Sequence, residues 1–173
     1  MDASRAEHTL LLVRHAKSDQ SATGPDHDRP LTPRGRRDAP ALGRWLASHV
    51  PPLDVVLCSS ARRARETWDL AGSVLQAEAP LDVRPSLYLA PPQTVLTQLR
   101  ALPADVRVVA VVGHEPTQSA LVELLAGAAE PRAARRLAEG FRTSAVARLT
   151  LDTEWAALAS GACRLTDFAV PRA

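Results

Sequence analysis

The chain has 173 residues, and 46% of them are hydrophobic. This length predicts one domain over 1–173, with enough apolar material for a core that needs neither disulfide nor metal. The formal net charge of +2 favours neither nucleic-acid binding nor binding to a membrane surface. Neither a secretory signal nor a run of roughly 18 apolar residues is visible. We therefore expect a cytoplasmic protein, with residues 1–7 as a flexible N-terminal tail.

The cysteine and lysine content adds two observations. Cys58 and Cys163 form neither a disulfide framework nor a metal-binding pattern, so we expect free, buried thiols in a reducing compartment. Of the 21 basic residues, 20 are arginine, and Lys17 is the only lysine. A GC-rich genome accounts for the abundance of arginine, but it does not explain the position of Lys17.

Short apolar runs predict the strands of a sheet. Residues 8–13, 54–58 and 106–112 are continuous apolar stretches rich in Leu and Val, which is typical of strands buried on both faces. Weaker patterns predict a further strand over 144–151 and an edge strand over 163–170.

Segments with helical spacing lie between these runs. The first expected helix begins at Thr32-Pro33 and is kinked or divided at Pro40. The second begins at Ser59 or Ser60 and carries the apolar stripe Ala64, Trp68, Ala71 and Leu75. Three more are expected around 96–102, from Pro116 to near Gly127, and over the arginine-rich residues 130–140. Strands that alternate with helices predict a three-layer α/β/α sandwich with a mostly parallel central sheet.

The ends of the three main strands carry the candidate functional residues. Ligands of open α/β sheets bind beyond the carboxyl ends of the strands. Those ends are followed by the sequences RHAKS at 14–18, SSARRA at 59–64 and GHEPT at 113–117. Arginine offers a planar fork of donors for phosphate oxygens, and helix N-termini add backbone donors. We therefore predict a phosphate site at this rim.

The histidines provide this phosphate site with a candidate nucleophile. Neighbouring cations disfavour protonation of an imidazole, and the neutral form is the one that attacks phosphorus. Covalent catalysis by histidine divides hydrolysis into transfer of phosphate to the enzyme and then to water. Because arginines compensate the phosphate charge, this chemistry requires neither a metal ion nor another cofactor.

Four ordered motifs resemble those of the histidine phosphatase superfamily, the group of phosphoglycerate mutase-like proteins, and within it the SixA-type phosphohistidine phosphatases. The motifs are RHAKS at 14–18, RPLTPRG at 29–35, SSARRARET at 59–67 and VGHEP at 112–116. Two positions depart from the usual pattern, because Ser60 stands where Pro is usual and Glu115 where Asn is frequent. The resemblance covers residues 10–127 and implies a phosphoglycerate mutase-like fold.

The resemblance also implies roles for single residues. It makes His15 the phosphorylated nucleophile. The residues that it places around the phosphate oxygens are Arg14, Arg63 and His114. Arg63 is preferred to Arg62 because it directly precedes Ala64 in the motif. Further expected substrate contacts at the rim, whose roles the resemblance does not fix, are Lys17, Ser18 and Arg34.

The general acid is left open by the resemblance. In the acid-phosphatase branch an Asp directly follows the second histidine, and Glu115 occupies that place here. One hypothesis is that Glu115 protonates the leaving group. The alternative is that its carboxylate only interacts with the positive end of a helix dipole. Phosphohistidine is a labile substrate and tolerates a weak or absent acid.

Three other patterns have simpler interpretations. Cys58 does not begin a cysteine-phosphatase loop, because Cys-x5-Arg would need an arginine at Ala64. His27 with Asp26 and Asp28 resembles a metal cluster, but residues 21–30 are expected to form a loop whose carboxylates are solvated or cap the loop. A solvated helix face, or alternatively a docking surface for an acidic partner, is formed by Arg132, Arg135 and Arg136.

The length of the chain also bears on the substrate. It leaves little room for the lid-forming insertions of larger family members, and an open site suits a phosphohistidine on another protein. The alternatives are a small phosphoester or a nucleotide as substrate, or a phosphate-binding module without turnover, which would not need His15. The oligomeric state stays open.

Overall fold

A computed structural model describes residues 7–173, so the expected tail at 1–7 lies outside the described residues except for Glu7. The strands are β1 (His8–Arg14), β2 (Val55–Ser59), β3 (Leu81–Arg84), β4 (Val108–Gly113), β5 (Ala126–Ala129), β6 (Val146–Leu151) and β7 (Cys163–Ala169). The helices are α1 (Pro33–His49), α2 (Arg62–Leu75), α3 (Pro92–Arg100), α4 (Thr117–Leu125) and α5 (Pro131–Ala138). Three short 3-10 helices are η1 (Asp26–Asp28), η2 (Pro85–Leu87) and η3 (Trp155–Ala157).

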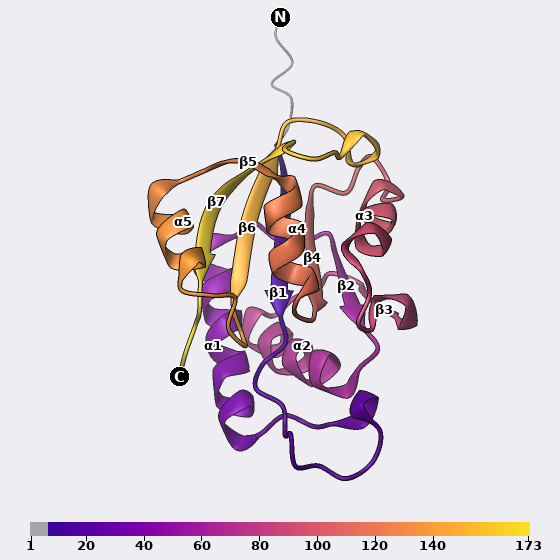
Figure 1. Ribbon diagram of the computed structural model, residues 1–173, viewed down its shortest axis with the longest axis vertical. Helices are drawn as coiled ribbons and strands as arrows, with labels where there is room; N and C mark the ends of the chain where they lie inside the picture. The colour runs from indigo at the N-terminus through magenta and orange to yellow at the C-terminus, as the bar shows by residue number, and fades with distance from the viewer. Residues whose placement is uncertain (1–6) are drawn as a thin grey trace, which may run out of the picture.

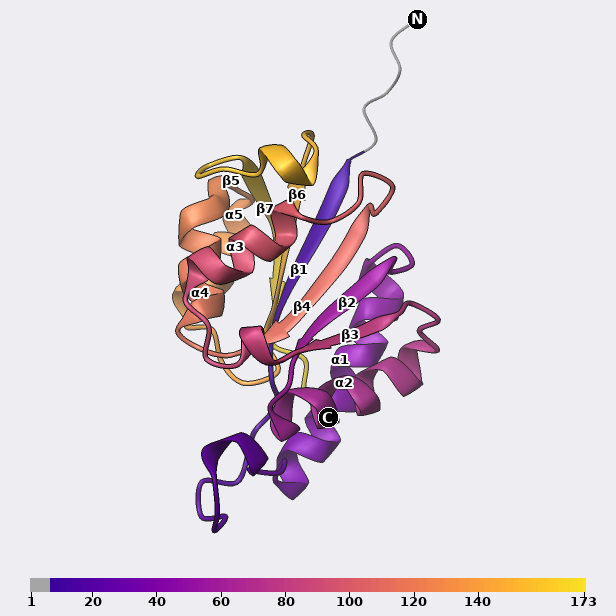
Figure 2. The ribbon, with the colours of Figure 1, turned by 90° about the vertical axis from the view of Figure 1, so that its right-hand side faces the viewer.

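The strands form one sheet in the order β3-β2-β4-β1-β6-β7-β5. In this sheet β6 runs antiparallel to both of its neighbours, and the other pairs are parallel. Helices α1 and α2 cover one face, while α3, α4 and α5 cover the other (Figure 1; Figure 2). The predicted α/β/α sandwich with a mostly parallel sheet is therefore confirmed.

The central strand β1 shows why continuous apolar runs form the middle of this sheet. Successive side chains of a strand point to opposite faces, and helices cover both faces here. Leu10 packs in one core cluster with Leu121 of α4, and Leu11 packs in the other with Leu42 of α1. All of residues 10–13 have 0% of their surface exposed.

The edges of the sheet differ from the prediction. Strand β7, expected at an edge, lies between β6 and β5, and the edges are β3 and β5, which were not predicted. Strand β3 has only four residues, and its exposed and half-buried positions alternate. Strand β5 consists of Ala and Gly, which strands do not favour. A Cβ on Gly127 would lie 2.2 Å from the carbonyl oxygen of Gly161, so this strand depends on a close backbone approach.

Helix α1 continues through Pro40 as one helix rather than two. Proline removes one backbone hydrogen bond from a helix interior. Packing offsets this loss, because Leu42 and Leu46 are buried and a Cβ on Gly43 would lie 2.2 Å from the carbonyl oxygen of Ala71 in α2. The contact between α1 and α2 thus decides the course of the helix.

Helix α2 begins after Ala61, and neither serine caps it as expected. The Ser59 hydroxyl lies 2.7 Å from Nε2 of His114, and the Ser60 hydroxyl lies 2.9 Å from Nε2 of His27. Both serine hydroxyls therefore form hydrogen bonds with histidines at the rim of the sheet and do not cap α2.

Residues of the sequence motifs hold the segment that follows β1. A Cβ on Gly35 would lie 2.2 Å from the carbonyl oxygen of Lys17, so only glycine lets α1 approach this closely. The Thr67 hydroxyl accepts a hydrogen bond from the Ala16 amide at 2.9 Å and donates one to the Arg63 carbonyl at 2.6 Å. The segment after β1 is thereby fastened to both α1 and α2.

Two remaining predictions concern thiols and membranes. Cys58 and Cys163 are free and buried, as expected, and burial raises the pKa of their thiols to about 12 and about 11. Among residues 7–173, no helix combines the length and the apolar character needed to cross a membrane.

Candidate active site

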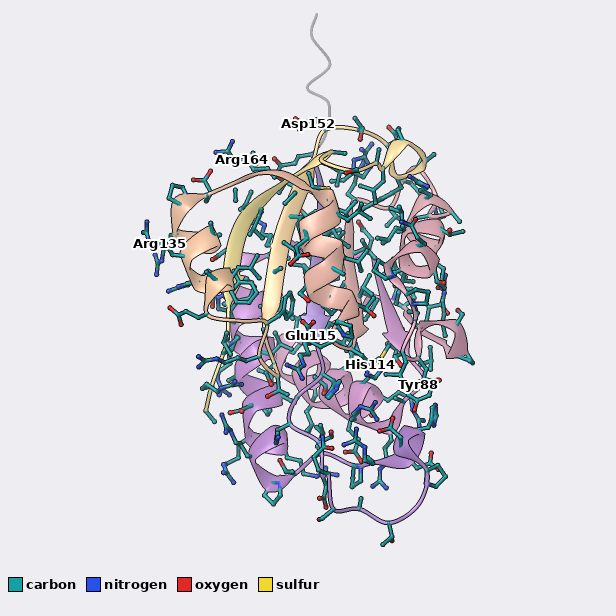
Figure 3. The ribbon with its side chains drawn as sticks, viewed as in Figure 1. Tyr88, His114, Glu115, Arg135, Asp152 and Arg164 are labelled. Carbon is teal, nitrogen blue, oxygen red and sulfur yellow. The ribbon has the colours of Figure 1, made fainter. Side chains whose placement is uncertain are left out.

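The carboxyl ends of β1, β2 and β4 meet at a cavity of about 250 Å³. The predicted site residues that line it are Arg14, His15, Lys17, Ser18, Arg63, His114 and Glu115. Figure 3 shows His114, Glu115 and Tyr88 near one another at this rim, whereas Arg135 of the arginine-rich helix α5 points outward at the left-hand side of the view, away from them. The cavity is where the sequence predicted the phosphate site.

The ring of His15 is neutral and has a defined tautomer. Its Nδ1 lies 2.7 Å from the Ala16 carbonyl oxygen, and Nδ1 carries the proton because a carbonyl only accepts. Nε2 therefore holds a lone pair, which accepts a hydrogen bond from Nε of Arg63 at 3.3 Å. Burial, reinforced by His114, Arg63 and Arg14 and opposed by the Ala16 hydrogen bond, lowers the pKa of His15 to about 3.

His114 is a second neutral imidazole beside His15, and their ring centroids are 5.2 Å apart. Its Nδ1 lies 3.4 Å from Nη2 of Arg63, so Nδ1 accepts and Nε2 donates to the Ser59 hydroxyl. Burial first, and then the charge of Arg63, lowers the pKa of His114 to about 4. The sequence attributed neutral histidines to cations alone, but burial is the larger cause at both rings.

The structure distinguishes Arg63 from its neighbour Arg62. The Arg63 side chain is 2% exposed and contacts both histidines. Arg62 is 47% exposed and bonds to Glu66 at 2.8 Å. Successive residues of a helix point about 100° apart, so only one of the two arginines faces the cavity. That arginine is Arg63, the one that the motif favoured.

Arg14 approaches the cavity from the end of β1. Its Nη1 donates to the Phe141 carbonyl at 2.7 Å, while its buried Nε has no partner within residues 7–173. A buried donor without an acceptor costs free energy. A phosphate oxygen would satisfy this donor.

Asp26 lines the cavity, so the expectation that its carboxylate is only solvated or caps a loop is wrong. Its Oδ2 accepts hydrogen bonds from Nη2 of Arg63 at 3.0 Å and from the Tyr88 hydroxyl at 2.6 Å, and its Oδ1 accepts one from Nε of Arg29 at 2.8 Å. Its carbonyl oxygen accepts a further bond from Nη1 of Arg63 at 2.7 Å. The Tyr88 hydrogen bond, followed by those of the two arginines, outweighs burial and holds the pKa of Asp26 well below its usual range. Asp26 is therefore ionised and fixes the Arg63 guanidinium.

Tyr88 and Arg29 are two further residues that the prediction missed. The Tyr88 ring lies edge-on to His114, with 5.7 Å between centroids, and Cζ of Arg63 lies 5.9 Å from the centre of that ring. Nη1 of Arg29 donates to the Ser18 hydroxyl at 3.2 Å. Arg29 opens the RPLTPRG motif, which was an available signal, whereas Tyr88 lies in none of the four motifs.

The predicted substrate contacts are not all in the cavity. Lys17 and the buried Ser18 line it, but Arg34 does not. Arg34 is 60% exposed and pairs with Asp38 at 3.5 Å, one turn further along α1. Arg29 lines the cavity instead, because the loop that carries it folds over the end of β1.

Glu115 lines the same cavity. Its Oε2 accepts a hydrogen bond from the Ser119 hydroxyl of α4 at 2.6 Å, and its buried Oε1 has no partner within the described chain. The bond to the first turn of α4 fits the role at a helix start. The free oxygen beside the cavity fits a proton donor, so both interpretations of Glu115 stand.

Comparisons with known proteins define the class of this protein. A family model for the histidine phosphatase superfamily (branch 1) matches residues 10–88. Phosphohistidine phosphatase SixA of Escherichia coli K12 is 31% identical over 146 residues, which cover 83% of this chain and 85% of that protein. The chain belongs to the histidine phosphatase superfamily and, within it, to the SixA-type branch.

Two further relatives span nearly the whole chain. An uncharacterized protein of Mycobacterium tuberculosis is 42% identical over 162 residues, which cover 92% of this chain and 100% of the relative. The structure of a candidate phosphohistidine phosphatase SixA from Nakamurella multipartitia has a TM-score of 0.84 and 38% identity, and the match covers 96% of this chain and 98% of that one.

The lowered pKa values predict that His15 and His114 stay neutral from pH 8 to pH 5.5. Because they fall to about 3 and about 4, the ring ¹⁵N resonances of both histidines should not move over this range in an NMR titration. A ring that titrates near pH 6.5 would contradict the assigned burial.

The same shifts predict how stability depends on pH. Below pH 6.5 the unfolded chain binds protons at both rings and the folded protein does not. The free energy of unfolding should therefore fall as the pH decreases, by about 1.4 kcal/mol per pH unit for each ring, until the folded pKa is reached. Urea unfolding at several pH values measures this slope, and His15→Ala should make it shallower.

Replacement of Asp26 tests its role in positioning Arg63. Asp26→Asn should lower kcat about tenfold on p-nitrophenyl phosphate, the effect of one hydrogen bond to a charged group. The inhibition constant of inorganic phosphate should not rise, because a negative charge has been removed. The control is Asp28→Asn, because Asp28 is a 65% exposed carboxylate in the same turn whose salt-bridge partner within residues 7–173 is the half-buried His27. Equal losses of turnover and phosphate affinity would indicate a general collapse of the site.

Proposed function

We propose that this protein is a phosphatase that works through a phosphohistidine intermediate on His15 and removes phosphate from phosphohistidine on another protein. The observation that carries the proposal is the neutral, buried ring of His15, whose Nε2 faces the guanidinium of Arg63. Membership of the histidine phosphatase superfamily supports phosphatase activity. The name of the E. coli relative supports phosphohistidine as the substrate.

In the first step, Nε2 of His15 attacks phosphorus and forms a P–N bond. The bond between phosphorus and the leaving group breaks, and its electron pair goes with the leaving group. Arg14 and Arg63 donate to the equatorial oxygens, where the negative charge lies. Nε of Arg63, which now meets Nε2 at 3.3 Å, turns to a phosphate oxygen. Because arginines compensate the charge, this step uses no metal ion.

In the second step, water attacks the phosphorylated His15. Nδ1 keeps the proton that it donates to the Ala16 carbonyl oxygen. The phosphorylated ring is therefore cationic, which makes it a good leaving group from phosphorus. The P–N bond breaks, its electron pair returns to Nε2, and the protons of the water remain with the phosphate or pass to solvent. The hydrogen bond to Ala16 thus prepares the ring for both steps.

The protonation states of the groups around the cavity support phosphohistidine as the substrate. Asp26 is ionised, and the proton on His114 is directed at Ser59, so neither group donates to a leaving group. A phosphohistidine whose second ring nitrogen is protonated brings its own proton and leaves as neutral imidazole. An alkyl phosphate has no such proton, and Glu115 is the candidate group beside the cavity to supply one.

A hydrolysis panel without added metal tests the proposal. The substrates are a phosphohistidine protein, p-nitrophenyl phosphate, a sugar phosphate and a nucleotide. Wild type should prefer the phosphohistidine protein, and His15→Ala should lower its turnover by about 10³-fold or more. A quench during turnover should trap a phosphoenzyme that is stable in alkali and labile in acid. His49→Ala, at an exposed histidine, is the matched control.

Each result of this panel separates the alternatives. Preference for a sugar phosphate or nucleotide would make the protein a small-molecule phosphatase. No turnover of any substrate would indicate a phosphate-binding module. Full activity of His15→Ala would contradict the covalent mechanism.

Glu115→Gln tests the proposed general acid. If Glu115 protonates poor leaving groups, kcat/KM for an alkyl phosphate should fall about 10²-fold, the lower end for general acid catalysis. Values for p-nitrophenyl phosphate and phosphohistidine should change little, because their leaving groups need no proton from the enzyme. Glu123→Gln, at an exposed position of α4, is the control. An unchanged value for the alkyl phosphate would leave Glu115 with its role at the helix start.

A further inference from the structure

Leu89 is the apolar exception in the lining of the active-site cavity. Every other described residue that lines this cavity has a polar or charged side chain. Leu89 is 55% exposed, the largest value among the exposed large hydrophobic residues of the described chain. A single exposed leucine elsewhere on a surface would need no explanation, but this one lies at the entrance to a phosphate site.

The backbone of Leu89 is strained. Its φ is +48°, in the left-handed region that costs free energy for a residue with a branched side chain. The other non-glycine residues with positive φ in the described chain are Gln76 and Ser144. Gln76 ends α2 as its C-cap, a common place for this conformation. Leu89 directly follows Tyr88, the C-cap of η2, at a position where glycine is usual, so a leucine is held here at a cost in free energy.

The neighbours of Leu89 hold it in this conformation. Tyr88 is fastened on one side by its hydroxyl, which donates to Asp26 at 2.6 Å. Ala90 is fastened on the other side, where its carbonyl accepts a hydrogen bond from the Thr117 hydroxyl at 2.5 Å. Leu87 and Ala90 are buried. The chain thus turns between two fixed points and leaves the Leu89 side chain at the mouth of the cavity.

Strain that persists at a functional site is often part of its function. We propose that Leu89 is a specificity residue that contacts an apolar side chain next to the phosphohistidine of a protein substrate. This inference rests on the proposed function and refines it. A small phosphoester ends near the phosphate and gains little from an apolar group at the rim, whereas a polypeptide necessarily continues past the rim. Covering Leu89 removes its apolar surface from water and stabilises that complex.

Two variants of Leu89 separate the contact from the strain. Leu89→Gly and Leu89→Ala both remove the contact, but only glycine accepts the positive φ without strain. We expect both to raise KM for a phosphohistidine protein about tenfold, the effect of leaving roughly half of a leucine side chain in water, with little change in kcat. Values for p-nitrophenyl phosphate should stay within about twofold, a difference smaller than one hydrogen bond makes. The Tm of Leu89→Gly should exceed that of Leu89→Ala by about 2–4 °C.

Val83→Ala is the matched control. Val83 is 41% exposed on β3, in the same part of the chain, but it does not line the cavity, so its replacement should leave KM for both substrates unchanged. A phosphohistidine protein with Gly in place of the apolar neighbours of its phosphohistidine provides the reciprocal test. Wild type should lose affinity for this substrate, and the Leu89 variants should not discriminate between the two proteins.

The possible results distinguish this inference from the proposed function. If wild type hydrolyses the phosphohistidine protein and the Leu89 variants match it, the inference is wrong and the proposed function stands. If KM for p-nitrophenyl phosphate rises equally, Leu89 only shapes the cavity, which also contradicts the inference. If wild type hydrolyses p-nitrophenyl phosphate but no phosphohistidine protein, the proposed substrate and the inference both fail.

Discussion

The buried guanidinium of Arg63 is the constraint on which the active site depends. A positive charge removed from water needs a charged partner and satisfied donors. Arg63 is 2% exposed, and its partners come from three separate segments, namely His15 after β1, His114 after β4 and Asp26 in η1. The loop that follows β1 therefore has to fold over the end of the sheet, because it brings the carboxylate that compensates this charge.

This arrangement gives the histidines and the carboxylate of the site different protonation states. Burial keeps both histidines neutral, while hydrogen bonds keep Asp26 ionised. The proposed nucleophile, His15, thus needs no general base, and the carboxylate that bonds to Arg63 holds no proton to donate. Such a site suits a leaving group that needs no proton from the enzyme, which is the chemical basis for proposing phosphohistidine rather than an alkyl phosphate as the substrate.

The sequence predicted those parts of the fold that depend on local pattern. Continuous apolar runs identified β1, β2 and β4, because strands covered on both faces have no polar alternation. It failed where the pattern is weak or is overruled by packing. Strand β5 is built from Ala and Gly, α1 passes through Pro40 because Gly43 packs on α2, and β7 is internal because the unpredicted β5 pairs beside it.

The sequence by itself determined which motifs meet at one rim, because the carboxyl ends of parallel strands lie at the same edge of a sheet. The motifs after β1, β2 and β4 bring His15, Arg63 and His114 together there. Only the tertiary structure decided which further groups complete the site. Asp26 meets Arg63 across 37 positions of the chain, and Tyr88 meets Asp26 across 62. Contacts between segments so far apart leave no periodic or local signal in a sequence. Arg34, which was expected at the rim as a substrate contact, pairs with Asp38 instead, because the direction of a side chain is set by the helix that carries it.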